Sequence, residues 1–317
     1  MNPAISLTAK VLPLAATGLL WLTGARLGRL LPPATAVRLL TVVALAAALA
    51  TGFMLSVAAF LALAQIPHLA AQGQWSVTAL RAGDQVPVIV GVPAGILVSM
   101  LLAAAARHAV RAGRDVATAA LACRRLSPAA GRLVVVEDDQ PAAYALPGIH
   151  GRIIVTTTML QALPADERRV LLAHEAAHLT HHHHHLYIQT AELAAAANPL
   201  LRPLARAICA AAERWADETA AAEVGDRRLA ARALARAGLA HATATGARRT
   251  PRASLAAAET HLTDRIRALL NPPPRRRTGL ASALVATVLI TAASAALTAH
   301  QTERQFELAH AEFTHQR

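Results

Sequence analysis

Four long apolar segments restrict the folds that this chain can adopt. A helix needs about 20 largely apolar residues to cross the hydrocarbon core of a bilayer. Runs of about this length lie at about residues 5–25, 39–65, 85–106 and 278–300. The sequence therefore predicts a mainly α membrane protein with four transmembrane helices, three of which lie within residues 1–106.

The composition agrees with a membrane protein and excludes several other classes. Apolar residues make up 55% of the 317 residues and charged residues only 16%, with a mean hydropathy of +0.38. Soluble domains contain about 25% charged residues. A disordered chain, a collagen and a wholly soluble enzyme are therefore excluded, and two cysteines are too few for a disulfide framework.

The basic residues predict the orientation in the membrane. The net charge is +12, but the arginines lie beside the apolar runs and not in a stripe with aromatic residues, so we expect no nucleic-acid partner. Lysine and arginine near the ends of spans favour the cytoplasmic side. One side would carry most of them: Arg26, Arg29, Arg38, Arg107, Arg111, Arg114, Arg124, Arg125, Arg265, Arg267, Arg275, Arg276 and Arg277. The other side would carry Lys10, Arg81, Arg304 and Arg317.

These charges lead to a specific expected topology. We expect an inner membrane of a bacterial type, an amino terminus outside, a cytoplasmic domain over residues 107–277, a fourth span at 278–300 and a short external tail at 301–317. A cleaved signal peptide is the competing interpretation of the first run. It is disfavoured because Arg26 and Arg29 follow the apolar residues and do not precede them.

Two strands and a helix are expected in the large loop. Residues 132–137 and 152–157 are rich in β-branched residues and predict a small β-sheet. Pro164 then suits the first turn of a helix, and Asp166 and Glu167 suit its positive end. Because no proline recurs before Pro199, we expect one helix from about Pro164 into the 190s.

Within that helix, the order His174-Glu175-Ala176-Ala177-His178 has the spacing of a metal site. Residues four apart lie one above the other on a helix, so His174 and His178 can bind one ion while Glu175 projects toward a metal-bound water. The pattern predicts two zinc ligands and a catalytic general base.

A catalytic zinc site needs a third protein ligand and one open position. A helical stretch after Pro203 carries Glu213-Arg-Trp-Ala-Asp217, whose two carboxylates are four residues apart. We expect Glu213 to be the third ligand of one Zn²⁺ per chain. We expect Asp217 to accept the remaining N–H of a ligand histidine. The alternative is a solvated pair of carboxylates on a helix surface.

The order of these segments resembles the membrane-embedded gluzincin peptidases. The resemblance lies between Leu133 and Asp226 and is carried by AAYALPG, GRIIVTTTML, LLAHEAAHLTHHHHH and ERWADE. The BlaR/MecR-type metallopeptidases are most similar, and HtpX and the CAAX prenyl proteases are more distantly similar. The resemblance implies an α+β zincin-like protease domain and a zinc-dependent endopeptidase. It also implies that extended substrate pairs with the strand at residues 153–157.

The chain departs from these families in two places. The β-lactam receptors carry a large external penicillin-binding domain after the last span, whereas this chain ends soon after that span, so we do not expect it to sense β-lactams directly. The stretch around His261 and Arg265 resembles the His-to-Arg-Ile segment of the HtpX group but is shorter. His261, Arg265 and Tyr144 are therefore secondary candidates for contacts with the substrate or transition state.

The run from His181 to His185 has two possible interpretations. On a continuous helix, His181, His182 and His185 share a face with His178 and would form a second metal site. Alternatively, the run is a solvated helix end that becomes charged below about pH 6.5. The low charge of residues 186–212 leaves open whether they enter the bilayer.

Taken together, these features predict a membrane-embedded endopeptidase that acts on a cytoplasmic or membrane-associated protein. Its partners would be a protein or peptide substrate and the lipid bilayer, and a transcription repressor in a signalling pathway is a candidate substrate. The alternative is an inactive peptidase relative or a histidine-rich metal-binding membrane protein.

Overall fold

The computed structural model describes residues 3–82, 87–125, 132–146, 151–246, 252–275 and 277–315. Four features of the sequence lie outside these ranges, namely the first residues of the expected third span (85 and 86), the last two residues of the segment AAYALPG (Pro147 and Gly148), Arg276 and Arg317.

Within the described ranges, four helices are long and apolar enough to cross a membrane, as the sequence predicts. The candidate spans are Lys10–Leu30, Pro33–Leu63, Ile89–Cys123 and Thr278–His315. They lie in α1 (Pro3–Leu30), α2 (Pro33–Leu63), α5 (Val88–Arg125) and α12 (Thr278–His315). The expected fold class, a mainly helical membrane protein with a small sheet, is thus confirmed.

Two of these helices are longer than the apolar runs that predicted them. Both α5 and α12 have 38 residues, which at 1.5 Å per residue gives a length of about 57 Å. The hydrocarbon core is only about 30 Å thick. Helix α5 is therefore longer than a bilayer crossing requires. It continues through the arginine-rich residues 107–125, whose many alanines favour helix.

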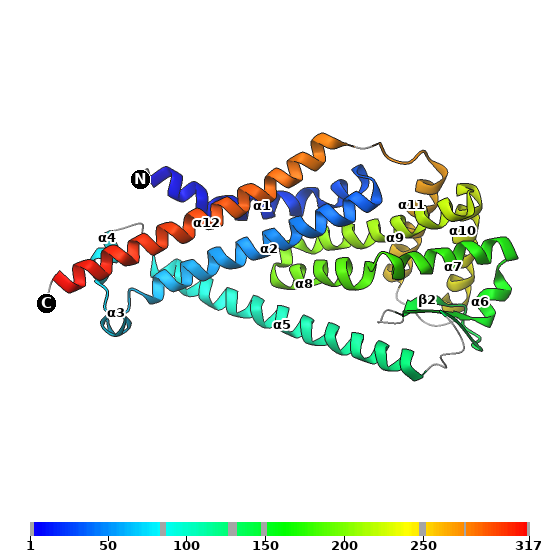
Figure 1. Cartoon of the computed structure of the whole chain (residues 1–317), viewed down its shortest axis with the longest axis horizontal. Coiled ribbons are helices and arrows are strands. Elements are labelled where there is room, and N and C mark those ends of the chain that lie inside the picture. Colours follow the sequence, from blue (N-terminus) through cyan, green and yellow to red (C-terminus); the bar gives the residue numbers. More distant parts are fainter. Residues whose placement is uncertain are drawn as a thin grey trace.

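Helix α12 likewise continues through the expected tail. Its end packs on the connection between α2 and α5, which contains α3 (Pro67–Gly73) and α4 (Val77–Ala82) (Figure 1). The backbone N–H of Ser76 donates to the carbonyl of Ala309 at 2.8 Å, and the indole of Trp75 donates to the carbonyl of Ala64 at 2.8 Å.

The chain that follows the expected metal-binding helix packs among the spans. It consists of α8 (Gln189–Ala197), a 3₁₀ turn at Pro199–Leu201 and α9 (Arg202–Val224). In Figure 1, α8 and α9 lie between α2 and α5. Their small side chains share one core with the spans. This core contains Leu20, Leu31, Ala36, Val37, Leu40, Val43, Ala44, Ala191, Ala194, Leu201, Leu204, Ile208, Ala211, Trp215 and Leu284. Residues 186–212 are therefore held by the membrane helices and not by the sheet.

The sheet has three strands in the order β1-β3-β2. Strand β1 (Leu133–Val136) is parallel to β3 (Arg152–Thr156), and β2 (Ala143–Leu146) is antiparallel to it. The sequence did not predict β2, because Ala-Tyr-Ala-Leu lacks β-branched residues. The expectation that substrate pairs with residues 153–157 is wrong, since β3 is central and both of its edges are already paired. Strand β2 lies at an edge of the sheet.

The expected single helix from Pro164 into the 190s is broken. Helix α7 (Ala165–Thr180) ends at a turn, and a π-helix follows over His183–Ile188. His182 adopts a left-handed conformation with φ of 53°, which interrupts the regular helix. The expected common face of His181, His182 and His185 with His178 assumed a continuous helix, which the structure does not have; the side chain of His185 lies outside the part of the chain that the structure describes.

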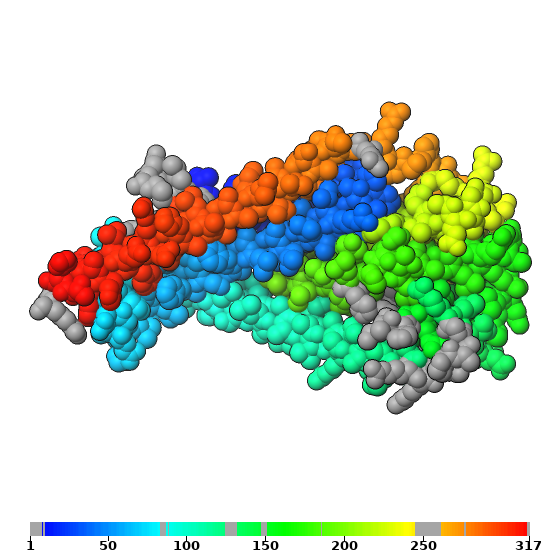
Figure 2. Space-filling view, in the orientation of Figure 1, coloured from blue at the N-terminus to red at the C-terminus, as the bar shows by residue number. Residues whose placement is uncertain are grey.

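The remaining helices complete the end of the molecule that carries the sheet. They are α6 (Thr157–Ala162), α10 (Arg227–Gly246) and α11 (Arg252–Leu270). Buried residues of α7, α9, α10 and α11 form a second core, which includes Val170, Ala173, Ala220, Ala230, Ala233 and Leu269. In Figure 2 the molecule is elongated, and α12 (orange to red) and α2 (blue) run along its length. Residues of about 160–240 (green to yellow) form the end opposite the carboxyl terminus of α12.

Candidate metal centre

Helix α7 places its polar pattern against α9. Asp166 and Glu167 lie in its first turn, where acidic residues complement the helix dipole. Glu167 is buried, and its carboxylate forms an ion pair with Nε of Arg236 of α10 at 3.0 Å. Ala173 and Ala177 are buried and allow α9 to approach closely. One face of α7 is thereby held against α9, and His174 and His178 project from it.

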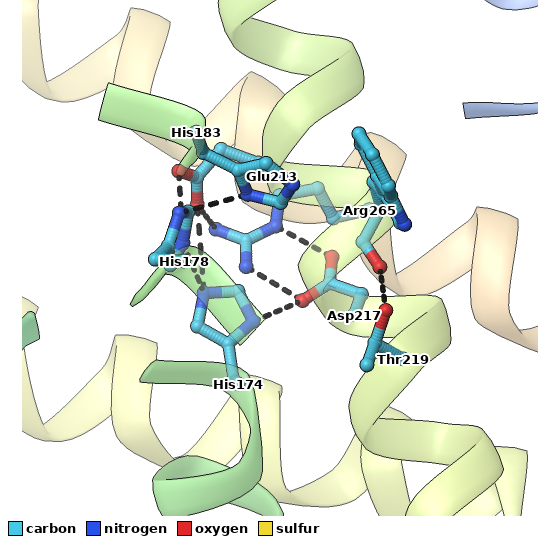
Figure 3. A network of polar contacts seen from close by, with 8 residues as sticks. His174, His178, His183, Glu213, Asp217, Thr219 and Arg265 are labelled. Carbon is cyan, nitrogen blue, oxygen red and sulfur yellow. Dashed lines mark hydrogen bonds and ion pairs between the residues drawn. The ribbon is translucent and has the colours of Figure 1, made fainter. Parts of the chain in front are cut away.

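Helix α9 contributes two carboxylates one turn apart. Ala212, Ala216 and Ala220 are buried beside them, so the backbones of the two helices can approach each other. Figure 3 shows Glu213 and Asp217 pointing toward the imidazoles of α7. The sequence spacing thus translates into two rings and two carboxylates that face each other.

The nitrogen and oxygen atoms at this point fit a single metal ion. The Nε2 atoms of His174 and His178 are 3.1 Å apart. The Glu213 carboxylate lies 3.7 Å from Nε2 of His174 and 3.5 Å from Nε2 of His178. Ligand bonds of about 2.0–2.1 Å in a tetrahedron place donor atoms about 3.3 Å apart. The donor set of two imidazoles and one carboxylate, within 4.8 Å of one another, is also one that zinc prefers.

Asp217 lies behind the first imidazole. Its carboxylate accepts from Nδ1 of His174 at 3.0 Å and from Nη2 and Nε of Arg265 at 2.7 and 2.8 Å. Arg265, on α11, also lies 3.0 Å from Glu213 through Nη1. One guanidinium therefore orients both carboxylates of α9, and Asp217 holds the proton of His174 on Nδ1 so that Nε2 is free to bind metal.

The pKa values of these groups follow from burial and pairing. Burial alone would raise the pKa of Asp217, but the hydrogen bonds from Arg265 and His174 outweigh it and lower the pKa to about 2. Burial likewise lowers the pKa of His174, and the hydrogen bond and charge of Asp217 raise it above its usual value. Burial lowers the pKa of His178 to about 4 despite the opposing charge of Glu213.

Glu175 lies on the same turn of α7 as the first imidazole and is buried. Burial raises the pKa of its carboxyl above the usual value, and a backbone hydrogen bond from Ala145 of β2 partly offsets this effect. A carboxyl group with a raised pKa is better matched to accepting and returning a proton near neutral pH.

Part of the chain around this centre matches a known protein family over residues 110–191. The family is Peptidase family M48. M48 peptidases are zinc-dependent, so the match supports a protease of the metallopeptidase class. The M48 match includes α7 but ends before Glu213. No curated protein and no solved structure matches the chain.

A cavity of about 440 Å³ opens beside His174 and Glu175 of α7. His174, Glu175, Glu213 and Arg265 line one wall together with Tyr144 of β2. Asp217 and His241 also line the cavity. The other lining residues are small or aliphatic and include Met159, Val170, Ala220, Ala230, Ala233, Leu234, Ala237, Gly238, Leu262 and Leu269. The cavity thus joins the metal-binding groups to an apolar recess.

The secondary candidates occupy different places. Tyr144 is half exposed at the cavity, and Arg265 pairs with the carboxylates of α9. His261 is exposed on α11 and does not line this cavity, although its neighbour Leu262 does.

Sequence reasoning missed His183. Its imidazole is fully buried, and its Nδ1 lies 3.1 Å from Nδ1 of His178. Burial lowers the pKa of His183 to about 3. The histidine run drew attention to this segment, but the position of one member depends on the break after α7.

The residues between the two carboxylates of α9 connect the centre to the spans. Arg214 donates to the carbonyl of Gly28 at the end of α1. The ring of Trp215 stacks on His181 with a centroid distance of 4.4 Å, and Arg38 of α2 lies 4.8 Å from the Trp215 ring centroid. The helix that carries Glu213 is therefore anchored directly to α1 and α2.

Proposed function

We propose that this protein is a membrane-embedded zinc endopeptidase in which His174, His178 and Glu213 hold the ion and Glu175 is the general base. The observation that carries the proposal is the convergence of three donor atoms, from two helices, at distances suited to one ion, beside a buried carboxyl in the same cavity. The M48 match supports the same class of reaction.

The residues of the chain would divide the chemistry as follows. When bound, zinc would polarise the peptide carbonyl and lower the pKa of water toward about 7. Glu175 accepts the proton of the attacking water on its carboxylate and later donates it to the leaving amine. Asp217 and Arg265 hold the side chains of the metal ligands in a fixed orientation during the reaction.

Substrate binding would use the sheet edge. We propose that an extended peptide lies along β2, because β2 is at the edge of the sheet and Ala145 and Tyr144 lie beside the catalytic carboxyl. An edge strand offers unpaired backbone groups to a peptide. The apolar recess would accept an aliphatic or aromatic side chain of the substrate.

We propose that the protein is of the BlaR/MecR subtype and lies in a bacterial-type inner membrane with the topology inferred from the charges. In this topology, residues 1–106 form the first membrane region and residues 107–277 form a cytoplasmic protease domain. Residues 278–300 form the fourth span, and residues 301–317 form an external tail. The anchoring of α9 to α1 and α2 supports a substrate close to the membrane surface, and a repressor in a signalling pathway remains a candidate.

The test is a comparison of wild type with Glu175→Gln, both purified in detergent, by zinc analysis and by cleavage of an unstructured protein. Glu175→Gln should retain zinc and lose cleavage by a factor of about 10²–10⁴, because proton transfer is removed. Glu213→Gln should lose zinc as well. The exposed Glu223→Gln, on the same helix as Glu213, is the matched control and should behave as wild type.

A Glu175→Gln protein that cleaves as fast as wild type would refute the proposed base. A wild-type protein that binds zinc without cleaving any substrate would favour the alternative of a metal-binding membrane protein.

A further inference from the structure

His183 lies directly behind one of the two imidazoles of the candidate zinc site. Figure 3 shows its ring beside the ring of His178, with a dashed line between them. The two Nδ1 atoms are 3.1 Å apart, and the ring centroids are 5.0 Å apart at an interplanar angle of 87°. His183 has no exposed surface.

The direction of this hydrogen bond follows from the geometry of ligation. A neutral histidine that binds metal through Nε2 carries its proton on Nδ1. Nδ1 of His178 must therefore be the donor, and Nδ1 of His183 must be the acceptor. The reverse arrangement would place the proton of His178 on Nε2, where it would block the metal.

The local fold brings His183 to this position. On a continuous helix, His182 would follow His178 by four residues. The left-handed conformation of His182 and the π-helix that starts at His183 instead break the regular helix, and the ring of His183 lies against the ring of His178. π-Helical turns often occur at functional sites.

Packing from α9 holds the ring of His183 in place. Trp215 lies 4.7 Å from it, measured between ring centroids, and His181 stacks on the His183 ring at a centroid distance of 5.5 Å. Because Trp215 lies between Glu213 and Asp217 in the sequence, the same helix that supplies one ligand also positions the partner of another.

Packing alone does not explain why the buried residue at position 183 is a histidine. Its Nε2 atom is buried and has no hydrogen-bond partner among the residues that the structure describes. Leaving a buried polar atom unpaired costs about 1–3 kcal/mol. A leucine at this position would avoid that cost, so the imidazole needs a reason other than filling space.

We propose that His183 is a positioning residue for zinc. Its Nδ1 accepts the hydrogen bond from Nδ1–H of His178, selects the tautomer of that ring and aims Nε2 at the ion. The two ligand histidines thus have different outer partners, Asp217 for His174 and His183 for His178. This inference rests on the proposed zinc site.

The experiment uses the full chain in detergent and measures zinc affinity by competition with a chelator. His183→Leu removes the acceptor in a similar volume, whereas His183→Asn keeps an acceptor oxygen near the position of Nδ1. Loss of an outer partner of a metal ligand typically costs 10–100-fold in affinity. We expect a loss of about this size for His183→Leu and affinity close to wild type for His183→Asn. The exposed His184→Leu serves as the matched control.

Two further readouts separate positioning from packing. The unfolding temperature of the metal-free His183→Leu protein should not fall, and the visible spectrum of its cobalt-substituted form should change, because the orientation of His178 at the ion changes. If His183→Leu does not fold, His183→Phe provides a ring without nitrogen.

The outcomes distinguish the two proposals. If wild type binds zinc tightly and His183→Leu binds it equally well, the role of His183 is refuted while the zinc site stands. If Leu and Asn weaken binding equally and both lower the unfolding temperature of the metal-free protein, His183 acts through packing and the inference fails. If wild type binds no zinc, the proposed function fails, and the role of His183 fails with it.

Discussion

Arg265 binds both carboxylate oxygens of Asp217 across 48 residues of sequence. This bidentate pair joins α11 to α9 directly behind the first imidazole of the candidate zinc site. Through its third nitrogen Arg265 also reaches Glu213 at 3.0 Å. The guanidinium of Arg265 therefore balances the negative charge of both carboxylates, of which Asp217 is buried. The geometry of the centre depends on this guanidinium.

Replacement of Arg265 by methionine should destabilise the protein even without metal. Removing one partner of a buried ion pair leaves an uncompensated charge and costs roughly 3–5 kcal/mol. Thermal unfolding of the metal-free protein in detergent should show a clear decrease, and chelator competition should show weaker zinc binding. Arg267→Met is the matched control, because Arg267 is exposed and its pair with Asp264 is long, at 3.5 Å. Unfolding of Arg265→Met at the wild-type temperature would contradict this account.

Zinc binding should weaken on acidification at a pH set by His174. A protonated imidazole cannot bind metal. The pKa of His174 is raised, mainly by Asp217 against the effect of burial, while that of His178 is lowered to about 4. As the pH is lowered from neutral, His174 therefore takes up a proton before His178. The affinity for zinc should already decrease at a pH higher than 6.5, the ordinary pKa of histidine.

The Asp217→Asn variant tests the cause of that pH dependence. Asparagine lacks the charge that raises the pKa of His174, so the decrease in affinity should begin at a lower pH than in wild type. Affinity at neutral pH should also be about 10–100-fold weaker, as for other outer partners of metal ligands. A wild-type affinity that stays constant down to pH 4 would show that Asp217 does not control this proton.

The contact between Arg38 and Trp215 should stabilise the junction between α2 and α9. A guanidinium over an indole ring contributes about 0.5–2 kcal/mol, depending on desolvation. Arg38→Gln should therefore lower the unfolding temperature of wild type but have little effect in a Trp215→Leu background. Equal effects of Arg38→Gln in both backgrounds would show that the two side chains are not coupled.

The packing of α5 on α2 should depend on Gly91. A Cβ atom at this position would lie 2.1 Å from Cβ of Ala62 and 2.8 Å from the carbonyl oxygen of Ala58. Gly91→Ala should destabilise the protein by about 1–3 kcal/mol, the usual cost of overpacking. At Gly52, a Cβ would meet nothing within 4 Å, so Gly52→Ala should be neutral or stabilising. Equal unfolding temperatures for both variants would contradict the tight contact.

Features that depend on short stretches of chain could be predicted from the sequence. The length of an apolar run measures whether it can cross a bilayer, and the four spans follow from this alone. The four-residue spacing places His174 above His178, and Glu213 above Asp217, on any regular helix. The strand at Arg152–Thr156 follows from its β-branched residues.

Other features depend on contacts that no local pattern specifies. Strand β2 has little intrinsic preference for a strand and is held by pairing with β3 and by its contact with α7. The turn at His182 has a backbone conformation that is unfavourable for a residue with a side chain. The rings on either side of it in the sequence contact Trp215, with His181 stacked and His183 tilted.

The sequence alone therefore determined that this is a four-span membrane protein with a metal-binding pattern, because hydrophobic length and helical periodicity are local properties. Only the tertiary structure decided that α9 packs between α7 and the spans, that Arg265 pairs with Asp217, and that His183 lies behind His178. These relationships join side chains far apart in sequence or across a broken helix, and they arise only when packing brings the helices together.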